Sequence, residues 1–410
     1  MIMRLKFYTL LCISFLILFT ACNQDDDPVP AEKVTRTVLA YIMADNSLSG
    51  FASSDIDEMM KGMSTVDASL YNLLVYVDDA SSENSQSYSF PTLYRLSKDK
   101  RGNVTKEIIR EYKEQVSTDP SVMQEVMKRA FTEYPAESYG LVVWSHGEGW
   151  IPSPLPIVKN ASTRWIGQDG GHYLNITDMV SVFEAVGCHL DFILFDACFG
   201  QSIEVAYELR NNVSYIIGSP TEIPGPGASY DKVVPAMFAS ENVGVEVGKA
   251  YYEPYEAKYT GYSTSNDNWT GGASVSVINC AALEELASVT KQTLKSVDLN
   301  TLLNSNLFNY DKGNKYSTAR PYVGYYDMKQ LMQLLSTDIN AWTSVANNVI
   351  IYWKTTPKNY SGIANTMFPI PQETTCGVSH YIPMSTSSSA AVAYRSTAWY
   401  TAAGLDQMGW

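Results

Sequence analysis

The sequence predicts an α/β protein in which a mostly parallel sheet lies between two layers of helices. From residue 37 onward, apolar runs of strand length alternate with segments that have helical spacing, and strands joined through helices usually run parallel. Of the 410 residues, 45% are hydrophobic and 18% are charged, so the chain can bury a large core. The chain has one long apolar run and no heptad or Gly-X-Y repeat. This excludes multispan membrane proteins, coiled coils and collagens.

The first 21 residues have the pattern of a secretory signal. Arg4 and Lys6 precede an apolar stretch over residues 10–19, which is too short for a comfortable membrane span. Small residues then lead into Cys22, an arrangement that resembles the lipobox of bacterial lipoproteins. We therefore expect cleavage before Cys22, a lipid anchor on this residue, and a cell-envelope protein of the outer membrane that faces the periplasm or the cell surface. A plain secretory signal cut near Ala21 is the alternative.

An acidic tether and a core domain follow the signal. Residues 22–35 hold three consecutive Asp and two Pro, a composition typical of solvated segments. The core domain is expected over residues 36–260, where continuous apolar runs predict buried strands, and one-sided apolar spacing with capping residues predicts helices. The predicted strands are 37–43, 70–77, 93–96 at a sheet edge, 139–144, 190–195 and 213–218. The predicted helices are 53–63, 121–134, 176–186 and 199–210, and 151–171 is a long Pro/Gly-rich loop.

The pattern changes after about residue 220. A Gly/Pro loop over 221–230 is followed by shorter and less regular segments. We expect residues 261–410 to form a smaller α+β subdomain that packs on the core. Its predicted elements are a strand at 273–278, helices at 281–294, 326–335 and 339–353, and a closing pair of strands at 363–369 and 377–383.

Two strands of the core end in reactive residues. His146 follows the apolar run 141–144, and Cys198 follows the apolar run 192–195. In open α/β sheets, ligands bind in the crevice beyond the carboxyl ends of the strands, so both side chains are expected at one cleft. The two residues are 198 − 146 = 52 positions apart, and caspases also place their His about 50 residues before their Cys.

This pair fits a nucleophile and its base. The thiolate is the reactive form of Cys, and a neighbouring His can take up the thiol proton. The predicted helix at 199–210 would direct its positive end at Cys198, and the N–H groups of Gly147 and Cys198 could hold a developing oxyanion. A small buried Cys and a satisfied core His are the alternatives for either residue alone. Their matched positions favour catalysis.

The chain resembles the clostripain family of cysteine endopeptidases, in the clan that includes caspases, legumain and gingipains. The matching segments are Thr37-Val-Leu-Ala-Tyr-Ile-Met-Ala-Asp-Asn46, Ser145-His-Gly147, Asp196-Ala-Cys198, Gly218-Ser-Pro-Thr-Glu-Ile-Pro-Gly225 and Gly377-Val-Ser-His-Tyr-Ile-Pro383. The resemblance implies a caspase-like three-layer α/β/α fold, a His146/Cys198 dyad, a thioester acyl-enzyme and no metal in the chemistry. Some members depend on calcium, but no calcium loop is visible in the sequence.

The resemblance also implies a substrate preference and a self-cleavage. In the family, the acid two residues before the nucleophile lies in the pocket for the P1 side chain, so Asp196 favours Arg or Lys there. Glu222 is the candidate for a second acid, and a helix cap is the alternative for Asp196. Family members are often cut once between the His and Cys motifs. In this chain the basic residues of that interval are Lys159 and Arg164.

The remaining His and Cys residues are interpreted as structural. His172 is expected in a loop, and no second pair at ligand spacing accompanies Cys188 and His189, which argues against a metal site. Cys280, Cys376 and His380 are expected in the core or on the surface. No P-loop, G-x-S-x-G or G-x-G-x-x-G motif follows a predicted strand.

Charge narrows the choice of partners. The net charge is −14 and the isoelectric point is near 4.8, which argues against a nucleic-acid partner. A peptide or protein substrate, with membrane attachment through Cys22, is expected. Two functions remain open: an active cysteine endopeptidase, and a catalytically silent caspase-like lipoprotein that binds peptides or glycans. The intact pair of His146 and Cys198 favours the endopeptidase.

Overall fold

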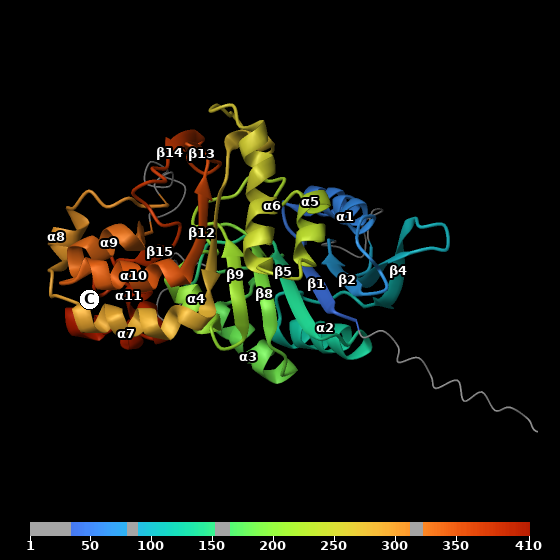
Figure 1. The fold of residues 1–410 in the computed structure, drawn as a ribbon, viewed down its shortest axis with the longest axis horizontal. Helices are drawn as coiled ribbons and strands as arrows, with labels where there is room; N and C mark the ends of the chain where they lie inside the picture. Colours follow the sequence, from blue (N-terminus) through green and yellow to red (C-terminus); the bar gives the residue numbers. More distant parts are fainter. Residues whose placement is uncertain (1–33, 80–88, 152–164, 312–322) are drawn as a thin grey trace, which may run out of the picture.

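The computed structural model describes residues 34–79, 89–151, 165–311 and 323–410, and contains a nine-stranded sheet between two layers of helices (Figure 1). The strand order is β12-β10-β9-β8-β5-β1-β2-β3-β4. The strands are β1 (Arg36–Met43), β2 (Tyr71–Asp78), β3 (Thr92–Lys98), β4 (Val104–Glu111), β5 (Ser138–Trp144), β8 (Leu190–Asp196), β9 (Val213–Gly218), β10 (Ser274–Asn279) and β12 (Ile350–Thr355). The predicted signal, Cys22, Lys159 and Arg164 lie outside the described residues.

The five central strands β9, β8, β5, β1 and β2 pair in parallel, and both sides of this block continue with antiparallel strands. Parallel pairing brings the carboxyl ends of β1, β5 and β8 to one edge of the sheet. Every residue of β1 is buried, because helices cover both faces. Leu39, Tyr41 and Met43 belong to the core on one face, while the alternating Val38, Ala40 and Ile42 belong to the core on the other. The predicted α/β/α layering is confirmed.

Two groups of helices form the outer layers (Figure 1). One face of the sheet is covered by α1 (Ser49–Met63), α5 (Tyr230–Met237) and α6 (Val243–Lys258). The other face is covered by α2 (Pro120–Glu133), α3 (Ile176–Val186), α4 (Ile203–Leu209) and α7 (Leu283–Thr293). Side-chain caps define where two of these helices begin. Asp119 accepts a hydrogen bond from the Ser121 N–H ahead of α2, and Asn175 forms a capping box with Asp178 at α3. Among the described residues, no helix has the length and apolarity of a membrane span.

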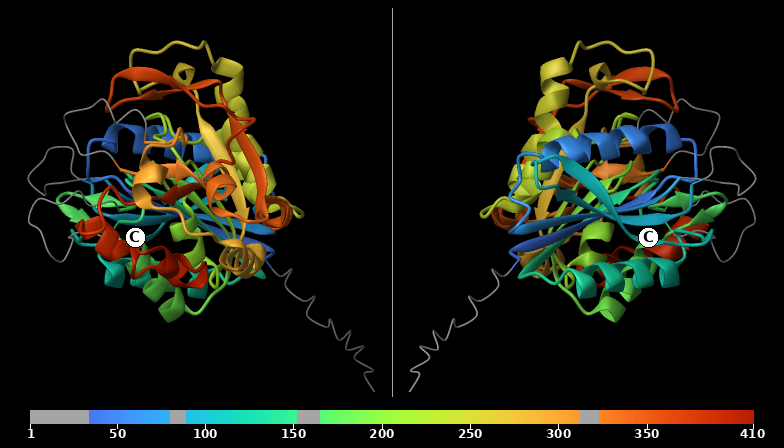
Figure 2. Two further views of the ribbon diagram at one scale, coloured as in Figure 1. Left: turned by 90° about the vertical axis from the view of Figure 1, so that its left-hand side faces the viewer. Right: turned by 90° about the vertical axis from the view of Figure 1, so that its right-hand side faces the viewer.

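The carboxyl-terminal residues add helices and short strand pairs. The helices are α8 (Leu299–Leu303), α9 (Met328–Leu335), α10 (Ile339–Val349), α11 (Ser389–Tyr394) and α12 (Ala398–Ala402). The short pairs are β6 (Gln168–Asp169) with β7 (His172–Tyr173), β11 (Tyr325–Asp327) with β15 (Ser379–Tyr381), and β13 (Lys358–Ser361) with β14 (Thr366–Pro369). Figure 2 shows the β13–β14 hairpin beside the end of α6, and the last helices on the opposite side of the sheet. The proposed boundary near residue 260 stays a prediction, and β10 and β12, which follow it, join the central sheet.

Several predicted elements are wrong in detail. The strand predicted at 93–96 is not an edge strand, because β3 pairs with both β2 and β4. The strands predicted at 363–369 and 377–383 do not pair with each other: β14 pairs with β13, and β15 pairs with β11. The helix predicted at 339–353 ends at Val349, where β12 begins. In each case the local apolar pattern was right, but the partner or the boundary depends on contacts that are distant in sequence.

Candidate active site

His146 and Cys198 lie just beyond the carboxyl ends of two neighbouring parallel strands. β5 and β8 pair with Trp144 opposite Asp196, and each reactive residue follows two positions later. Both side chains are half-buried, and both line the same two pockets. The structure thus brings together the two residues that the sequence places at strand ends.

Gly147 packs directly on the backbone of Cys198. A β-carbon at position 147 would lie 2.6 Å from the Cys198 carbonyl oxygen, so a larger residue would displace the loop that carries the thiol. The strand contact between Gly147 and Ile166 uses the N–H groups of Glu148 and Gly167 as donors, and not that of Gly147. The Gly147 N–H therefore does not serve that contact.

The imidazole of His146 is fixed by a serine from the turn after β1. Ser47 Oγ lies 2.8 Å from His146 Nε2, and the turn itself is held by Asn46, whose amide donates to the carbonyl of Gln168 at 2.9 Å. Burial lowers the pKa of His146, and the carboxylate of Glu148 partly opposes this. The ring is therefore neutral at neutral pH and able to accept a proton. This contact was not predicted from the sequence.

The segment after Cys198 is a tight turn. The prediction that a helix begins at residue 199 is therefore wrong. Phe199 has a φ of 57°, in a left-handed region that bulky residues rarely occupy, and α4 begins only after its cap, Ser202. The helix dipole is therefore not directed at the thiol as expected. Instead, the Ile223 N–H donates to Cys198 Sγ over 3.3 Å, a bond that stabilises negative charge on the sulfur.

A tyrosine from the carboxyl-terminal third supports this turn. The Tyr325 hydroxyl donates to the carbonyl of Glu148 at 2.9 Å, and its ring packs on Phe199 with a centroid distance of 5.7 Å. One side chain thus braces the segments that carry both His146 and Cys198. This role could not be predicted from the sequence, because Tyr325 lies in a short strand far along the chain.

Asp196 is a buried carboxylate surrounded by donors. Its exposed fraction is 2%. Oδ2 accepts from the Tyr230 hydroxyl at 2.7 Å and from the Ala228 N–H at 3.0 Å, and Oδ1 accepts from the Tyr251 hydroxyl at 2.9 Å. Burial raises its pKa, and these three hydrogen bonds oppose the rise. Since Ser202 caps α4, Asp196 does not act as a helix cap.

The two pockets beside the thiol differ in size and in acidic residue. The smaller, of about 390 Å³, is lined by Asp196 together with His146 and Cys198. The larger, of about 770 Å³, is lined by Glu222 together with the same pair. A second buried acid, Asp55, lies close enough to interact with Asp196, and burial followed by this interaction raises the pKa of Asp55 to about 9. Asp55 is therefore protonated at neutral pH, and Asp196 is the acidic residue that lines the smaller pocket.

Glu222 holds a loop from the carboxyl-terminal third. Its carboxylate accepts from the Ser361 hydroxyl at 2.5 Å and from the Gly362 N–H at 2.9 Å. Gly362 and Ile363 line the larger pocket with it. Glu222 and Asp196 thus line different pockets beside the thiol. The structure does not place both acids around the same P1 side chain of a substrate.

The other His and Cys residues lie apart from this site. His380 is buried, and its Nε2 accepts from the Trp399 indole at 3.0 Å, while burial lowers its pKa to about 4. His172 is exposed in β7 and does not line either pocket. Cys280 and Cys376 are buried. Across the four described segments, no cluster of three or more His, Cys, Asp or Glu residues is suited to a metal ion.

The chain is similar to known proteins over much of its length. The model of the clostripain family matches residues 40–405. Clostripain from Hathewaya histolytica is 27% identical over 228 residues, and the match covers 48% of this chain and only 41% of that protein.

Two solved structures match nearly the whole chain. A secreted C11 cysteine protease from Bacteroides thetaiotaomicron, solved with an irreversible peptide inhibitor, is 42% identical, with a TM-score of 0.79 and coverage of 91% of this chain and 99% of its own. An inactive zymogen C11 protease from Parabacteroides distasonis is 28% identical, with a TM-score of 0.74 and coverage of 90% and 98%.

Proposed function

This chain belongs to the clostripain family and is a cysteine endopeptidase with a caspase-like fold, and from this premise we propose that it cleaves after Arg or Lys with Cys198 as nucleophile and His146 as base. The observation that carries the proposal is the shared position of the two residues at adjacent strand ends, where both line the same two pockets. A peptide substrate is further supported by the peptide inhibitor bound to the Bacteroides relative.

The first half of the reaction forms a thioester. Neutral His146 takes the thiol proton, and the Cys198 sulfur attacks the scissile carbonyl carbon. The carbonyl oxygen becomes an oxyanion, for which the N–H groups of Gly147 and Cys198 are the proposed donors. The packing of Gly147 on the Cys198 backbone supports this choice of donors. The tetrahedral intermediate collapses as the C–N bond breaks, and the proton on His146 passes to the departing amine.

The second half restores the thiol. His146 then takes a proton from water, and the resulting hydroxide attacks the thioester carbonyl. The C–S bond breaks, the new carboxylic acid leaves, and the proton returns from His146 to Cys198 Sγ. The Ile223 N–H, which donates to this sulfur, supports its negative charge both before attack and on departure.

The smaller pocket is proposed to hold the P1 side chain. Its wall includes the buried carboxylate of Asp196. Two carboxylate oxygens offer about four acceptor positions, and three donors already occupy Asp196. One position is left for the guanidinium or ammonium group of a substrate. Glu222, in the wall of the larger pocket, is proposed to act on the substrate beyond P1, by its charge and by holding the loop at Gly362.

The enzyme is proposed to work in the cell envelope, anchored through a lipid on Cys22. The lipobox-like sequence before Cys22 and the secreted Bacteroides relative support this location.

The test is hydrolysis of Arg-, Lys- and norleucine-aminomethylcoumarin peptides by residues 23–410, with Cys198→Ala and His146→Ala as variants. Each variant is expected to lose activity by several orders of magnitude, with an unchanged thermal unfolding midpoint. Turnover by Cys198→Ala above a small fraction of wild type would refute the nucleophile, and equal cleavage of the norleucine peptide would refute the basic preference.

A further inference from the structure

A third pocket lies away from the thiol, between α3, α4 and α11. It encloses about 720 Å³ and shares none of its described lining residues with the two pockets at Cys198. Its apolar walls include Ile176 at the start of α3, and Val392 and Ala393 on α11. Val392 is 37% exposed, so the pocket has an opening at the surface.

Two polar groups of this pocket are buried and unsatisfied. Glu204 lines it and has an exposed fraction of 0%. Its Oε1 accepts from the Tyr381 N–H at 2.8 Å, but within the described ranges Oε2 has no hydrogen-bond partner. Trp150 also lines the pocket, and its indole Nε1 likewise has none among these residues. Buried polar groups in proteins are almost always paired, so the unpaired acceptor Glu204 Oε2 points to a donor that the described residues do not supply.

The ionisable residues described in the wall of this pocket are all acidic. Glu208, one turn after Glu204 on α4, is the second carboxylate in its wall, and the described lining residues include no Lys, Arg or His. Burial raises the pKa of Glu204 to about 7, as expected for a carboxylate without a cation beside it. A bound cation would favour the ionised form.

We propose that this pocket binds a small organic ammonium ion with an apolar tail. The ammonium group would donate to Glu204 Oε2, because a charge-assisted hydrogen bond to a buried carboxylate is strong. The tail would lie against Ile176, Val392 and Ala393. The Trp150 ring adds a cation–π surface.

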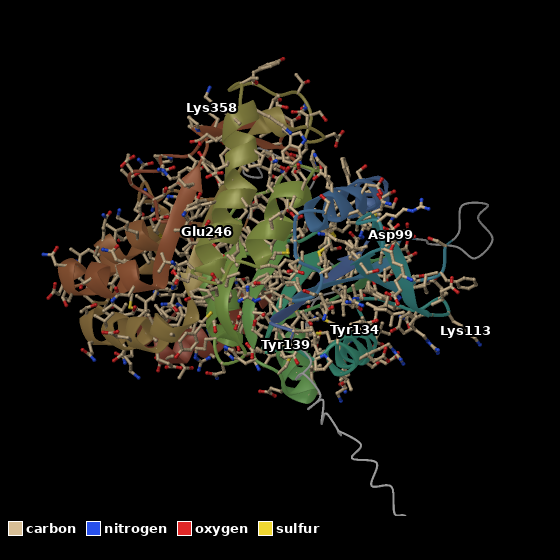
Figure 3. The ribbon with its side chains drawn as sticks, turned by 45° about the vertical axis from the view of Figure 1, so that its right-hand side comes forward. Asp99, Lys113, Tyr134, Tyr139, Glu246 and Lys358 are labelled. Atoms are coloured by element: carbon tan, nitrogen blue, oxygen red, sulfur yellow. The ribbon has the colours of Figure 1, made fainter. Side chains whose placement is uncertain are left out.

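This inference does not depend on the proposed peptidase specificity, and one titration tests it. The probe is 2-phenylethylamine, and its uncharged counterpart is 2-phenylethanol; binding to residues 23–410 is measured by calorimetry. We expect the amine to bind at least about tenfold more tightly than the alcohol. Glu204→Gln should weaken amine binding by at least about tenfold. The matched control is Glu246→Gln on the outer side of α6, where the carboxylate is 44% exposed (Figure 3), and it should leave binding unchanged.

Two further variants keep the test decisive. Asp196→Asn should not alter amine binding; a loss there would show that the probe occupies the P1 pocket and would overturn the proposal. If Glu204→Gln does not fold, Val392→Lys is used in its place. It introduces a competing cation at the partly exposed mouth of the pocket and should weaken binding of the amine by a similar factor. Equal affinity for amine and alcohol, or unchanged binding in the folded Glu204→Gln and Val392→Lys proteins, would also refute it.

Discussion

Ser47 Oγ lies 2.8 Å from His146 Nε2, so a hydroxyl from the turn after β1 occupies one nitrogen of the candidate catalytic base. When Nε2–H donates to this hydroxyl, the neutral ring keeps its lone pair on Nδ1. The contact therefore fixes the ring orientation, and in this tautomer Nδ1 is the nitrogen that can take a proton from a thiol.

Removal of the Ser47 hydroxyl should slow turnover without weakening substrate binding. For Ser47→Ala we expect kcat to fall by about tenfold, equivalent to roughly 1.4 kcal/mol, with little change in KM. Ser47→Thr keeps the hydroxyl and should retain most of the activity. Steady-state kinetics on an Arg-aminomethylcoumarin peptide measures kcat and KM of both variants. An unchanged kcat in Ser47→Ala would show that the contact does not contribute to catalysis.

The pH profile should report the burial of His146. Burial lowers its pKa below the usual 6.5, and Glu148 raises it. Because the base must be neutral, the acidic limb of kcat/KM should have its midpoint below pH 6.5. Glu148→Gln removes a charge that favours imidazolium, so it should shift this limb further toward low pH. Glu246→Gln is the control. A limb that stays in place or moves upward in Glu148→Gln would contradict this assignment.

Substrate preference should depend on the charge of Asp196. Asp196→Asn removes one partner of a buried charge pair, a change that costs about 2–5 kcal/mol. The ratio of kcat/KM for Arg over norleucine peptides should therefore fall by at least about thirtyfold. Tyr251→Phe removes one donor to Oδ1 while keeping the carboxylate, and should change the ratio much less. An unchanged ratio in Asp196→Asn would mean that this acid is structural.

Asp78 should make stability depend on pH. Its side chain has an exposed fraction of 0%, and neither oxygen has a hydrogen-bond partner in the described part of the chain. Burial, then Asp169, raises its pKa from 3.8 to about 9. Between these values the folded state holds a proton that the unfolded state has lost. Stability from this group therefore falls as pH rises, by about 1.4 kcal/mol per pH unit.

The variant Asp78→Asn removes this dependence. Urea unfolding in EDTA, at pH 5 and at pH 8, should show a stability advantage of the variant over wild type that is larger at pH 8. An advantage of equal size at both values would mean that Asp78 titrates alike in the two states.

The sequence was sufficient for the parts of the fold that local pattern determines. The apolar runs before His146 and Cys198 predicted β5 and β8, and parallel pairing then placed both residues at one edge. The apolar pattern did not predict α6, because Gly244, Gly248 and Pro254 lower the helix propensity of this segment. The structure explains the first two: a β-carbon at either glycine would lie 2.8 Å from a side-chain atom of the sheet.

The supporting contacts of the site could not be read from the sequence. Tyr230 and Tyr251, which donate to Asp196, come from α5 and α6, and their roles depend on how these helices pack. Tyr325 reaches the site from the last third of the chain. β4 was missed because its residues are mostly exposed, so it lacks the alternation that identifies a half-buried strand.

The late position of β10 and β12 in the chain leaves a strand edge exposed during synthesis. β9 is covered on its outer side by β10, and β10 in turn by β12, yet these partners are translated long after β9. A nascent chain that ends before residue 274 therefore exposes the backbone groups of Val213–Gly218, and such an open strand recruits other chains. Closure also requires pairing over long sequence separations, which is intrinsically slow. The growing chain consequently carries an aggregation-prone strand edge until the final third of the polypeptide has been made.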